Sequence, residues 1–451
     1  MKTPLALLAL LLPALAPTLG SAAHAQQVRV ETDLDHRLLR ANEKQTVHLR
    51  VALTGFELAS ERARAPLNVA IVIDKSGSMQ GDKISQAKDA ARAALSQLRA
   101  DDIVSIVAYD DTVEVLVPAT KVSDREVIER GINRLQAGGM TALFAGVVKG
   151  AGEVRKFLSK DRVNRVILLS DGAANVGPAS AGELSQLGKN LRREGVSVTT
   201  VGLGLGYNED LMVGLAQASG GQHVFVESEK QLAGIFREGF GNLGTIVAKE
   251  VVVRVKLAEG FRPVRVLARG GSSEATDNAD IVGQTVTVQM PALYARQMDD
   301  IVIEVEARAL APQTLQVATV DVSYHNIATQ NADKVSMALS AEVTTDIGRW
   351  NESEIPAVRV AVIERLANQE SRRAVELRDR GQVEEAQKVL EGNARRLKDG
   401  ASRYGSKALD DLSSQNELDA TNVKGEQWNK QRKVIQRRNS QSPYSLEKNN
   451  F

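Results

Sequence analysis

The stretch LNVAIVIDKSGSMQGDK, residues 67–83, decides how the rest of the chain is interpreted. It opens with the short, mostly apolar run Leu67–Ile73, which is typical of a strand buried on both faces of a sheet. The run ends at Asp74, and Ser76 and Ser78 follow at alternate positions. In an open α/β sheet, ligands bind outside the carboxyl ends of the strands. One carboxylate and two hydroxyls at that place are hard oxygen donors, which suit Mg²⁺ or Mn²⁺ rather than soft metals.

Two later segments add donors of the same kind. The segment GGMTALFAG places Thr141 in a glycine-bearing loop before a predicted helix. The segment VNRVILLSDG ends a second apolar strand, Val163–Leu169, with Ser170 and Asp171. The complete pattern is therefore D-x-S-x-S, a loop threonine, and an aspartate at the end of another strand.

This pattern resembles the von Willebrand factor type A (VWA) domain, which is shared with integrin inserted domains and many bacterial surface proteins. The resemblance covers Leu67 to Asn242. A lone D-x-S-x-S would be weak evidence, but every position of the family's metal-ion-dependent adhesion site matches in order: Asp74, Ser76, Ser78, Thr141 and Asp171. The resemblance implies a bound Mg²⁺, or Mn²⁺ or Ca²⁺, with one coordination position open to a Glu or Asp carboxylate of a partner protein. It implies a binding module and not an enzyme.

Composition excludes several other classes. Hydrophobic residues make up 43% of the 451-residue chain and charged residues 25%, which is ordinary for a globular protein with a sizeable core. The formal net charge of +1 gives no general attraction to nucleic acid. Cysteine is absent, so neither a disulfide framework nor a lipid-modified cysteine is expected.

The first residues predict export. Lys2 precedes the apolar run Leu5–Ala16, and Ala23-His24-Ala25 is an A-x-A site. This is the pattern of a secretory signal peptide over residues 1–25, cleaved after Ala25. We expect no membrane span after cleavage, and a secreted protein of a bacterial periplasm or cell surface.

The remaining pattern predicts an α/β fold with added modules. Strands and helices alternate through the central part, which favours a doubly wound, mostly parallel sheet. The expected organisation is a signal peptide (1–25), N-terminal strands that belong to the β-rich domain (26–62), a VWA domain (66–242), a β-sandwich-like domain (245–345), a helical hairpin (355–412) and a polar, basic, disordered tail (413–451).

Three functions compete at this stage. The first is cation-dependent adhesion to a partner protein. The second is a periplasmic assembly or scaffold factor that uses the same site inside a complex. The third is a Mg²⁺-dependent phosphoryl-transfer enzyme with Asp74 as nucleophile; such enzymes carry a second aspartate two residues on, where this chain has Ser76. The sequence therefore ranks the enzyme last.

Overall fold

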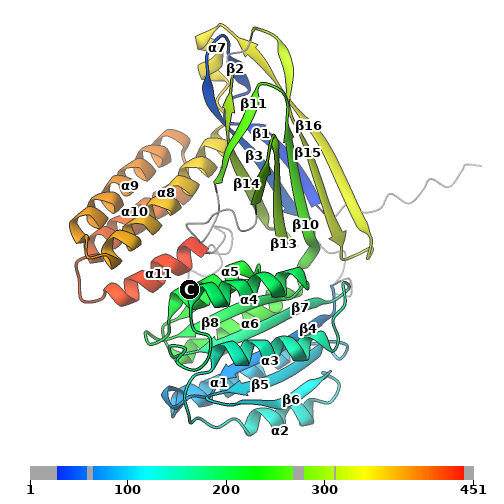
Figure 1. The fold of residues 1–451 in the computed structure, drawn as a ribbon. Helices are drawn as coiled ribbons and strands as arrows, with labels where there is room; N and C mark the ends of the chain where they lie inside the picture. The colour runs from blue at the N-terminus through cyan, green and yellow to red at the C-terminus, as the bar shows by residue number, and fades with distance from the viewer. Residues whose placement is uncertain (1–27, 58–63, 268–278, 309–310, 441–451) are drawn as a thin grey trace, which may run out of the picture.

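The computed structural model describes residues 28–57, 64–267, 279–308 and 311–440. These residues form an α/β domain, a β-sandwich and a helical region, which Figure 1 shows together. The predicted signal peptide lies outside the described residues. No helix in the described ranges is long and apolar enough to cross a membrane.

The α/β domain contains a six-stranded sheet in the order β6-β5-β4-β7-β8-β9. All neighbours pair in parallel except β6, which pairs antiparallel with β5 at the edge. The short connection between β5 and β6 explains this exception, because a parallel crossover needs about a dozen residues. The strands are β4 (Leu67–Asp74), β5 (Ile103–Tyr109), β6 (Val113–Lys121), β7 (Val163–Ser170), β8 (Ser197–Leu203) and β9 (His223–Val226).

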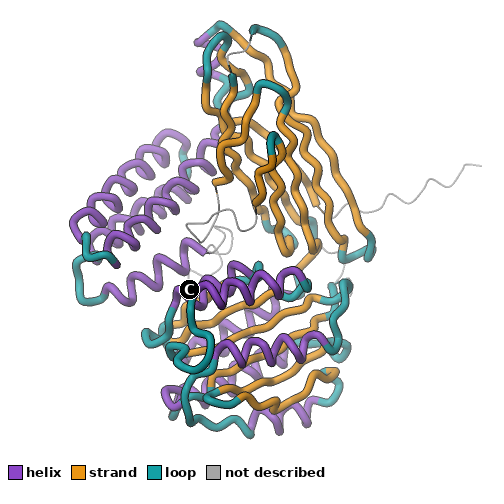
Figure 2. The backbone as a smooth tube through the Cα atoms, viewed as in Figure 1, coloured by secondary structure: helices purple, strands orange, loops and turns teal. Residues whose placement is uncertain are grey.

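Helices cover both faces of this sheet (Figure 2). Because side chains alternate along a strand, Ile71 and Ile73 pack on one face and Ala70 and Val72 on the other. The first face is covered by α1 (Asp82–Ser96), α2 (Arg125–Asn133) and α6 (Leu232–Leu243), and the second by α3 (Leu143–Arg155), α4 (Ala181–Arg193) and α5 (Glu209–Ala218). The predicted doubly wound fold is confirmed.

The β-sandwich packs a four-stranded sheet, β1-β3-β14-β11, against a six-stranded sheet, β12-β13-β10-β15-β16-β2. Its strands alternate buried and exposed positions, as in β10, which is the pattern of a sheet with one buried face. The bounds are β1 (Val28–Leu34), β2 (Leu38–Arg40), β3 (Gln45–Gly55), β10 (Ile246–Leu257), β11 (Phe261–Leu267), β12 (Ala279–Val282), β13 (Thr285–Tyr294), β14 (Met298–Ala307), β15 (Thr314–Asn326) and β16 (Ala332–Thr344).

The α/β domain is inserted between two strands of this sandwich. Strand β3 precedes the α/β domain and pairs with β14, which follows it. The two ends of the insertion lie close together: the carbonyl of Gly55 accepts a hydrogen bond from the amide of Arg296 at 2.8 Å, and that of Thr245 accepts one from the amide of Ala295 at 2.7 Å. Ala295 and Arg296, which are adjacent in the chain, thus hold both ends of the inserted domain.

The C-terminal region is more helical than its sequence suggested. It contains α7 (Ile347–Glu352), α8 (Pro356–Asp379), α9 (Val383–Tyr404), α10 (Lys407–Asn422) and α11 (Trp428–Ser440). The expectation of a hairpin followed by disorder from residue 413 is therefore wrong for residues 413–440, while residues 441–451 lie outside the described part.

Buried polar contacts explain this difference. Asn393 Nδ2 of α9 donates to Asn416 Oδ1 of α10 at 3.0 Å, and Ser413 Oγ donates to the carbonyl of Ala394 at 2.9 Å. Polar side chains that satisfy one another can be buried without a large penalty. A polar composition therefore did not imply a solvated segment here.

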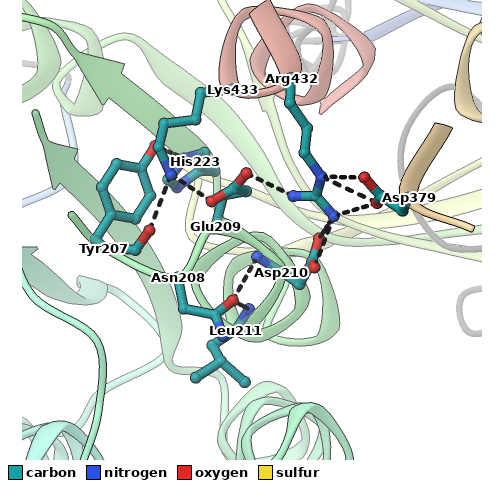
Figure 3. A network of polar contacts seen from close by, with 9 residues as sticks. All are labelled: Tyr207, Asn208, Glu209, Asp210, Leu211, His223, Asp379, Arg432 and Lys433. Carbon is teal, nitrogen blue, oxygen red and sulfur yellow. Dashed lines mark hydrogen bonds and ion pairs between the residues drawn. The ribbon is translucent and has the colours of Figure 1, made fainter. Parts of the chain in front are cut away.

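Helix α11 rests on the α/β domain through a network of charges (Figure 3). The side chain of Lys433, only 3% exposed, pairs with Glu209 at the start of α5 and donates to the carbonyl of Tyr207 at 2.9 Å. Arg432 pairs with Glu209, Asp210 and, at 2.8 Å, with Asp379 at the end of α8. The network joins three helices from two parts of the chain.

Candidate metal centre

The sheet topology brings the two predicted carboxylates to one edge. Strand β4 lies between β5 and β7, with Ile73 opposite Leu169 in register. Asp74 is the last residue of β4, and Asp171 directly follows β7. Parallel strands in register end at the same edge of a sheet, which is the place where open α/β sheets bind ligands.

The turn after β4 is held by backbone contacts. Ser76 donates its amide to Asp74 Oδ1 at 2.8 Å, and a single 3-10 turn follows over Gly77–Met79. The amide of Gly77 donates to the carbonyl of Gly139 at 3.0 Å. The serine turn is thus fastened to the loop that carries Thr141.

The hydroxyls of the predicted residues converge in front of Gly172. A Cβ atom placed on Gly172 would lie 3.4 Å from Thr141 Oγ1, 3.5 Å from Ser78 Oγ and 4.0 Å from Ser76 Oγ. Ser78 Oγ also donates to Asp171 Oδ1 at 2.6 Å and lies 3.1 Å from Ser76 Oγ. The structure therefore brings the predicted hydroxyls together at the carboxylate of Asp171.

Asp74 is the buried member of the set. Its Oδ2 atom accepts hydrogen bonds from Ser170 Oγ at 2.6 Å and Tyr109 Oη at 3.4 Å. Burial raises the pKa of its carboxyl, the nearby Asp171 raises it further, and the hydrogen bonds from Ser170 and Ser76 oppose this rise. A carboxylate in such surroundings favours a nearby positive charge, because the charge offsets the loss of hydration.

Several neighbours were not identified from the sequence. Lys83, in the first turn of α1, donates to Asp171 Oδ2 and, at 3.2 Å, to the carbonyl of Ser78. Lys75, inside the D-x-S-x-S segment, pairs with Asp110, and its side chain is only 16% exposed. Such partners come from other elements, so spacing along the chain gives no signal for them.

Asn175 connects two of the loops. Its Oδ1 atom accepts the amide of Thr141 at 2.8 Å, and its own amide donates to the carbonyl of Thr141 at 3.2 Å. The loop after β7 and the loop before α3 are therefore joined by two hydrogen bonds. These bonds hold the backbone of Thr141 in place.

The donor set fits a hard divalent cation. Carboxylate and hydroxyl oxygens are the ligands of Mg²⁺, Mn²⁺ and Ca²⁺, whereas zinc prefers nitrogen and sulfur. Nowhere in the described ranges do three or more His, Cys, Asp or Glu side chains cluster as metal ligands. The candidate site contains only two such side chains, Asp74 and Asp171. Its other proposed donors are the hydroxyls of Ser76, Ser78 and Thr141.

A comparison with protein families identifies the domain. Residues 68–238 match the model of the von Willebrand factor type A domain. The chain therefore contains a VWA domain, and the predicted resemblance is confirmed at this level.

Curated relatives share mainly this region. The uncharacterized protein sll0103 of Synechocystis is 29% identical over 210 residues, 47% of this chain and 49% of its own length. The uncharacterized protein YfbK of Escherichia coli is 28% identical over 217 residues, 48% of this chain and 37% of its own. Inter-alpha-trypsin inhibitor heavy chain H2 of mouse is 30% identical over 168 residues, 35% of this chain and 17% of its own. The chain thus matches half or less of the length of these relatives.

Solved structures resemble nearly the whole chain. A von Willebrand factor type A protein from Catenulispora acidiphila superposes with a TM-score of 0.68 at 18% identity, covering 87% of this chain and 91% of that one. The ArnB paralog VWA2 from Sulfolobus acidocaldarius gives 0.59 at 18% identity, covering 88% and 97%. At this identity the likeness concerns the fold alone, but it extends well beyond the VWA domain.

Proposed function

We propose that this protein binds a partner protein through a divalent cation held by Asp74, Ser76, Ser78, Thr141 and Asp171. The observation that carries the proposal is the convergence of the three hydroxyls beside Asp171, within 4.0 Å of one point at Gly172. The cation is Mg²⁺, with Mn²⁺ and Ca²⁺ as alternatives of the same donor preference.

The charge balance of the site suits capture of a carboxylate. Only two of the five side chains are anionic, and hydroxyls are neutral donors. When bound, the cation supplies an electrophilic position that accepts an outside oxygen ligand. The two carboxylates formally balance the two charges of the cation, and Lys83 beside Asp171 adds one further positive charge, so a Glu or Asp of the partner is the favoured ligand.

The environment does not favour phosphoryl transfer. Ser76 stands where an aspartate would be needed as the second acid, and Lys75 is engaged by Asp110. Lys83 is engaged by Asp171. Phosphoryl transfer needs several cations or donors placed around the transferred group. A binding role, in adhesion or in envelope assembly, fits these residues better.

We place this function outside the cytoplasm, in the periplasm or at the surface of a bacterium. The basis is the signal-peptide pattern of residues 1–25, and two of the relatives named above belong to bacteria. Adhesion and assembly differ in the partner, which is a foreign or neighbouring surface in the first case and a stable envelope component in the second.

Capture of envelope proteins with and without cation tests the proposal. The immobilised full chain should retain the same protein in Mg²⁺, release it in chelator and retain it again when Mg²⁺ is restored. Asp171→Asn should abolish the capture. The matched control is Asp89→Asn, which removes a half-exposed carboxylate on α1 that pairs with Arg92. Equal capture by Asp171→Asn and the control would contradict the proposal.

A further inference from the structure

A second candidate site lies at the opposite end of the α/β sheet from the metal centre. Arg165 on β7, Thr199 on β8 and Gln222 just before β9 stand at the beginnings of three adjacent strands. Ile167 and Val201 follow two residues later on the same face, since side chains alternate along a strand. This is the face that α1 and α6 cover.

Helices α1 and α6 leave part of the sheet face uncovered at this end. A cavity of about 90 Å³ lies between the beginnings of these strands and the last turns of α6. Tyr294 and Gln297 of the sandwich line its remaining side. A cavity of this size has room for roughly six to nine water molecules, at 10–15 Å³ for each, or for a compact organic molecule. It lies at the junction between the VWA domain and the sandwich.

Arg165 is the charged residue of the cavity wall. It is 4% exposed. Its Nη1 donates to Thr199 Oγ1 at 3.1 Å and its Nη2 approaches Tyr294 Oη at 3.5 Å, but its Nε has no hydrogen-bond partner. Among the residues that the structure describes, no aspartate or glutamate lines the cavity and none forms an ion pair with Arg165. A buried cation without an anion is costly, so the arrangement favours an anion from outside.

The other walls define the kind of anion. Ile167, Val224 and Phe236 line the cavity with apolar surface, and the exposed Gln222 and Asn242 lie at its border with solvent. An inorganic anion would leave the apolar walls without a partner. A planar carboxylate matches the fork of a guanidinium, and an apolar body of up to about ten heavy atoms matches the volume.

We propose that this cavity binds a small organic monocarboxylate, with Arg165 holding the carboxylate and the sheet face and α6 holding the apolar body. Such a ligand would touch the VWA domain and Tyr294 of the sandwich at once, and would therefore fix the two domains relative to each other. The proposal is independent of the metal centre, because it concerns the other end of the sheet.

Benzoate is the probe, and benzamide is its neutral counterpart of the same shape. In calorimetry with the full chain, benzoate should bind saturably with a stoichiometry of one, and benzamide at least tenfold more weakly. Benzoate should also raise the midpoint of thermal unfolding in proportion to its saturation. No saturable binding at 10 mM benzoate would overturn the proposal.

Three variants locate the binding. Arg165→Met removes the charge but keeps an unbranched stem, and should reduce benzoate affinity at least tenfold. Tyr294→Phe keeps the ring and removes the hydroxyl, and should reduce it severalfold, which provides a second test should Arg165→Met not fold. Arg162→Met is the control, because Arg162 lies three residues earlier and donates to the carbonyls of Leu67 and Asp101 outside the cavity wall. Unchanged affinity in Arg165→Met or Tyr294→Phe would overturn the assignment.

Discussion

At the scale of single residues, the contact between Lys83 and Asp171 makes a direct prediction about cation affinity. Lys83 places a positive charge on the carboxylate that the proposed cation would use. Lys83→Met should therefore tighten Mg²⁺ or Mn²⁺ binding three- to tenfold, about 0.6–1.4 kcal/mol, since like charges at close range oppose each other. Calorimetry measures this, with Lys88→Met on the same helix as the control. Weaker binding in Lys83→Met would mean that Lys83 orients Asp171 instead of competing.

A second residue, His223, predicts a dependence of stability on pH. Its ring is buried and hydrogen-bonded to Thr200 and Tyr207. Burial lowers its pKa from 6.5 to about 3. The unfolded chain therefore binds a proton below pH 6.5 that the folded chain does not, so the contribution of His223 to stability is constant above that pH and falls below it. The loss is about 1.4 kcal/mol for each pH unit, or roughly 2 kcal/mol at pH 5.

Thermal unfolding between pH 7.5 and 5 tests this, with His223→Gln as the comparison. The variant lacks the titrating ring, so its midpoint should change less than that of the unmodified chain over this range. The other histidines are common to both proteins and cancel in the difference. Parallel curves would contradict a neutral, buried His223.

The sequence could predict the ligands of the candidate centre but not the residues around them. Asp74 and Asp171 were recognisable because each ends an apolar run, and Ser76 and Ser78 because they alternate in the following turn. Ser170, next to Asp171, was visible in the sequence, yet its hydrogen bond to Asp74 depends on the pairing of β4 with β7. Such contacts are set by tertiary structure, which single-sequence patterns do not encode.

At the scale of elements, helix α11 connects the C-terminal region to the loop behind the metal centre. Lys433 lies 4.0 Å above the ring of Tyr207 and pairs with Glu209. In the same loop, a Cβ on Gly206 would lie 2.9 Å from the carbonyl oxygen of Asp171. The contacts of α11 therefore support a loop that lies against the backbone of Asp171, one of the proposed metal ligands.

Replacing Lys433 tests the importance of this docking. Lys433→Met leaves the buried Glu209 with Arg432 alone and should weaken the docking by up to about 3–5 kcal/mol, the usual consequence of breaking a buried pair. Lys430→Met is the control, because its pair with Glu227 is exposed and should matter by about 1 kcal/mol or less. Hydrogen exchange should show lost protection in α11 and in the start of α5 for Lys433→Met only. Equal protection in both variants would contradict a structural role of the buried pair.

Prediction from sequence succeeded where an element has a strong apolar pattern and failed where polar contacts hold it. The buried strands β4 and β7 contain the apolar runs Val69–Ile73 and Val166–Leu169, so their positions were clear. Helix α11 has few apolar residues, and ion pairs with the α/β domain and α8 hold it in place. A basic composition alone indicated a tail, because the acidic partners are distant in sequence.

At the scale of the whole molecule, the position of the VWA domain as an insertion predicts separable folding. Gly55 and Thr245 are held by adjacent residues, so a short linker can join them. A chain in which a Gly/Ser linker replaces residues 58–244, ended at Asn422 to remove α11, should keep a cooperative melt and a β-rich circular dichroism spectrum. Strand β3 should be indispensable, since it lies between β1 and β14. This organisation would be contradicted if the sandwich unfolded after residues 58–244 were replaced. It would also be contradicted if the sandwich still folded after residues 28–57 were deleted.

Titration of the full chain with Mg²⁺ and Mn²⁺ by calorimetry tests the central claim most directly. The account predicts saturable binding of one cation, at least tenfold weaker in Asp74→Asn, Asp171→Asn and Ser78→Ala, with circular dichroism unchanged. Asp89→Asn, which alters a half-exposed carboxylate on α1, should bind like the unmodified chain. Affinity that stays the same in Asp74→Asn and Asp171→Asn would show that these residues do not form a metal centre.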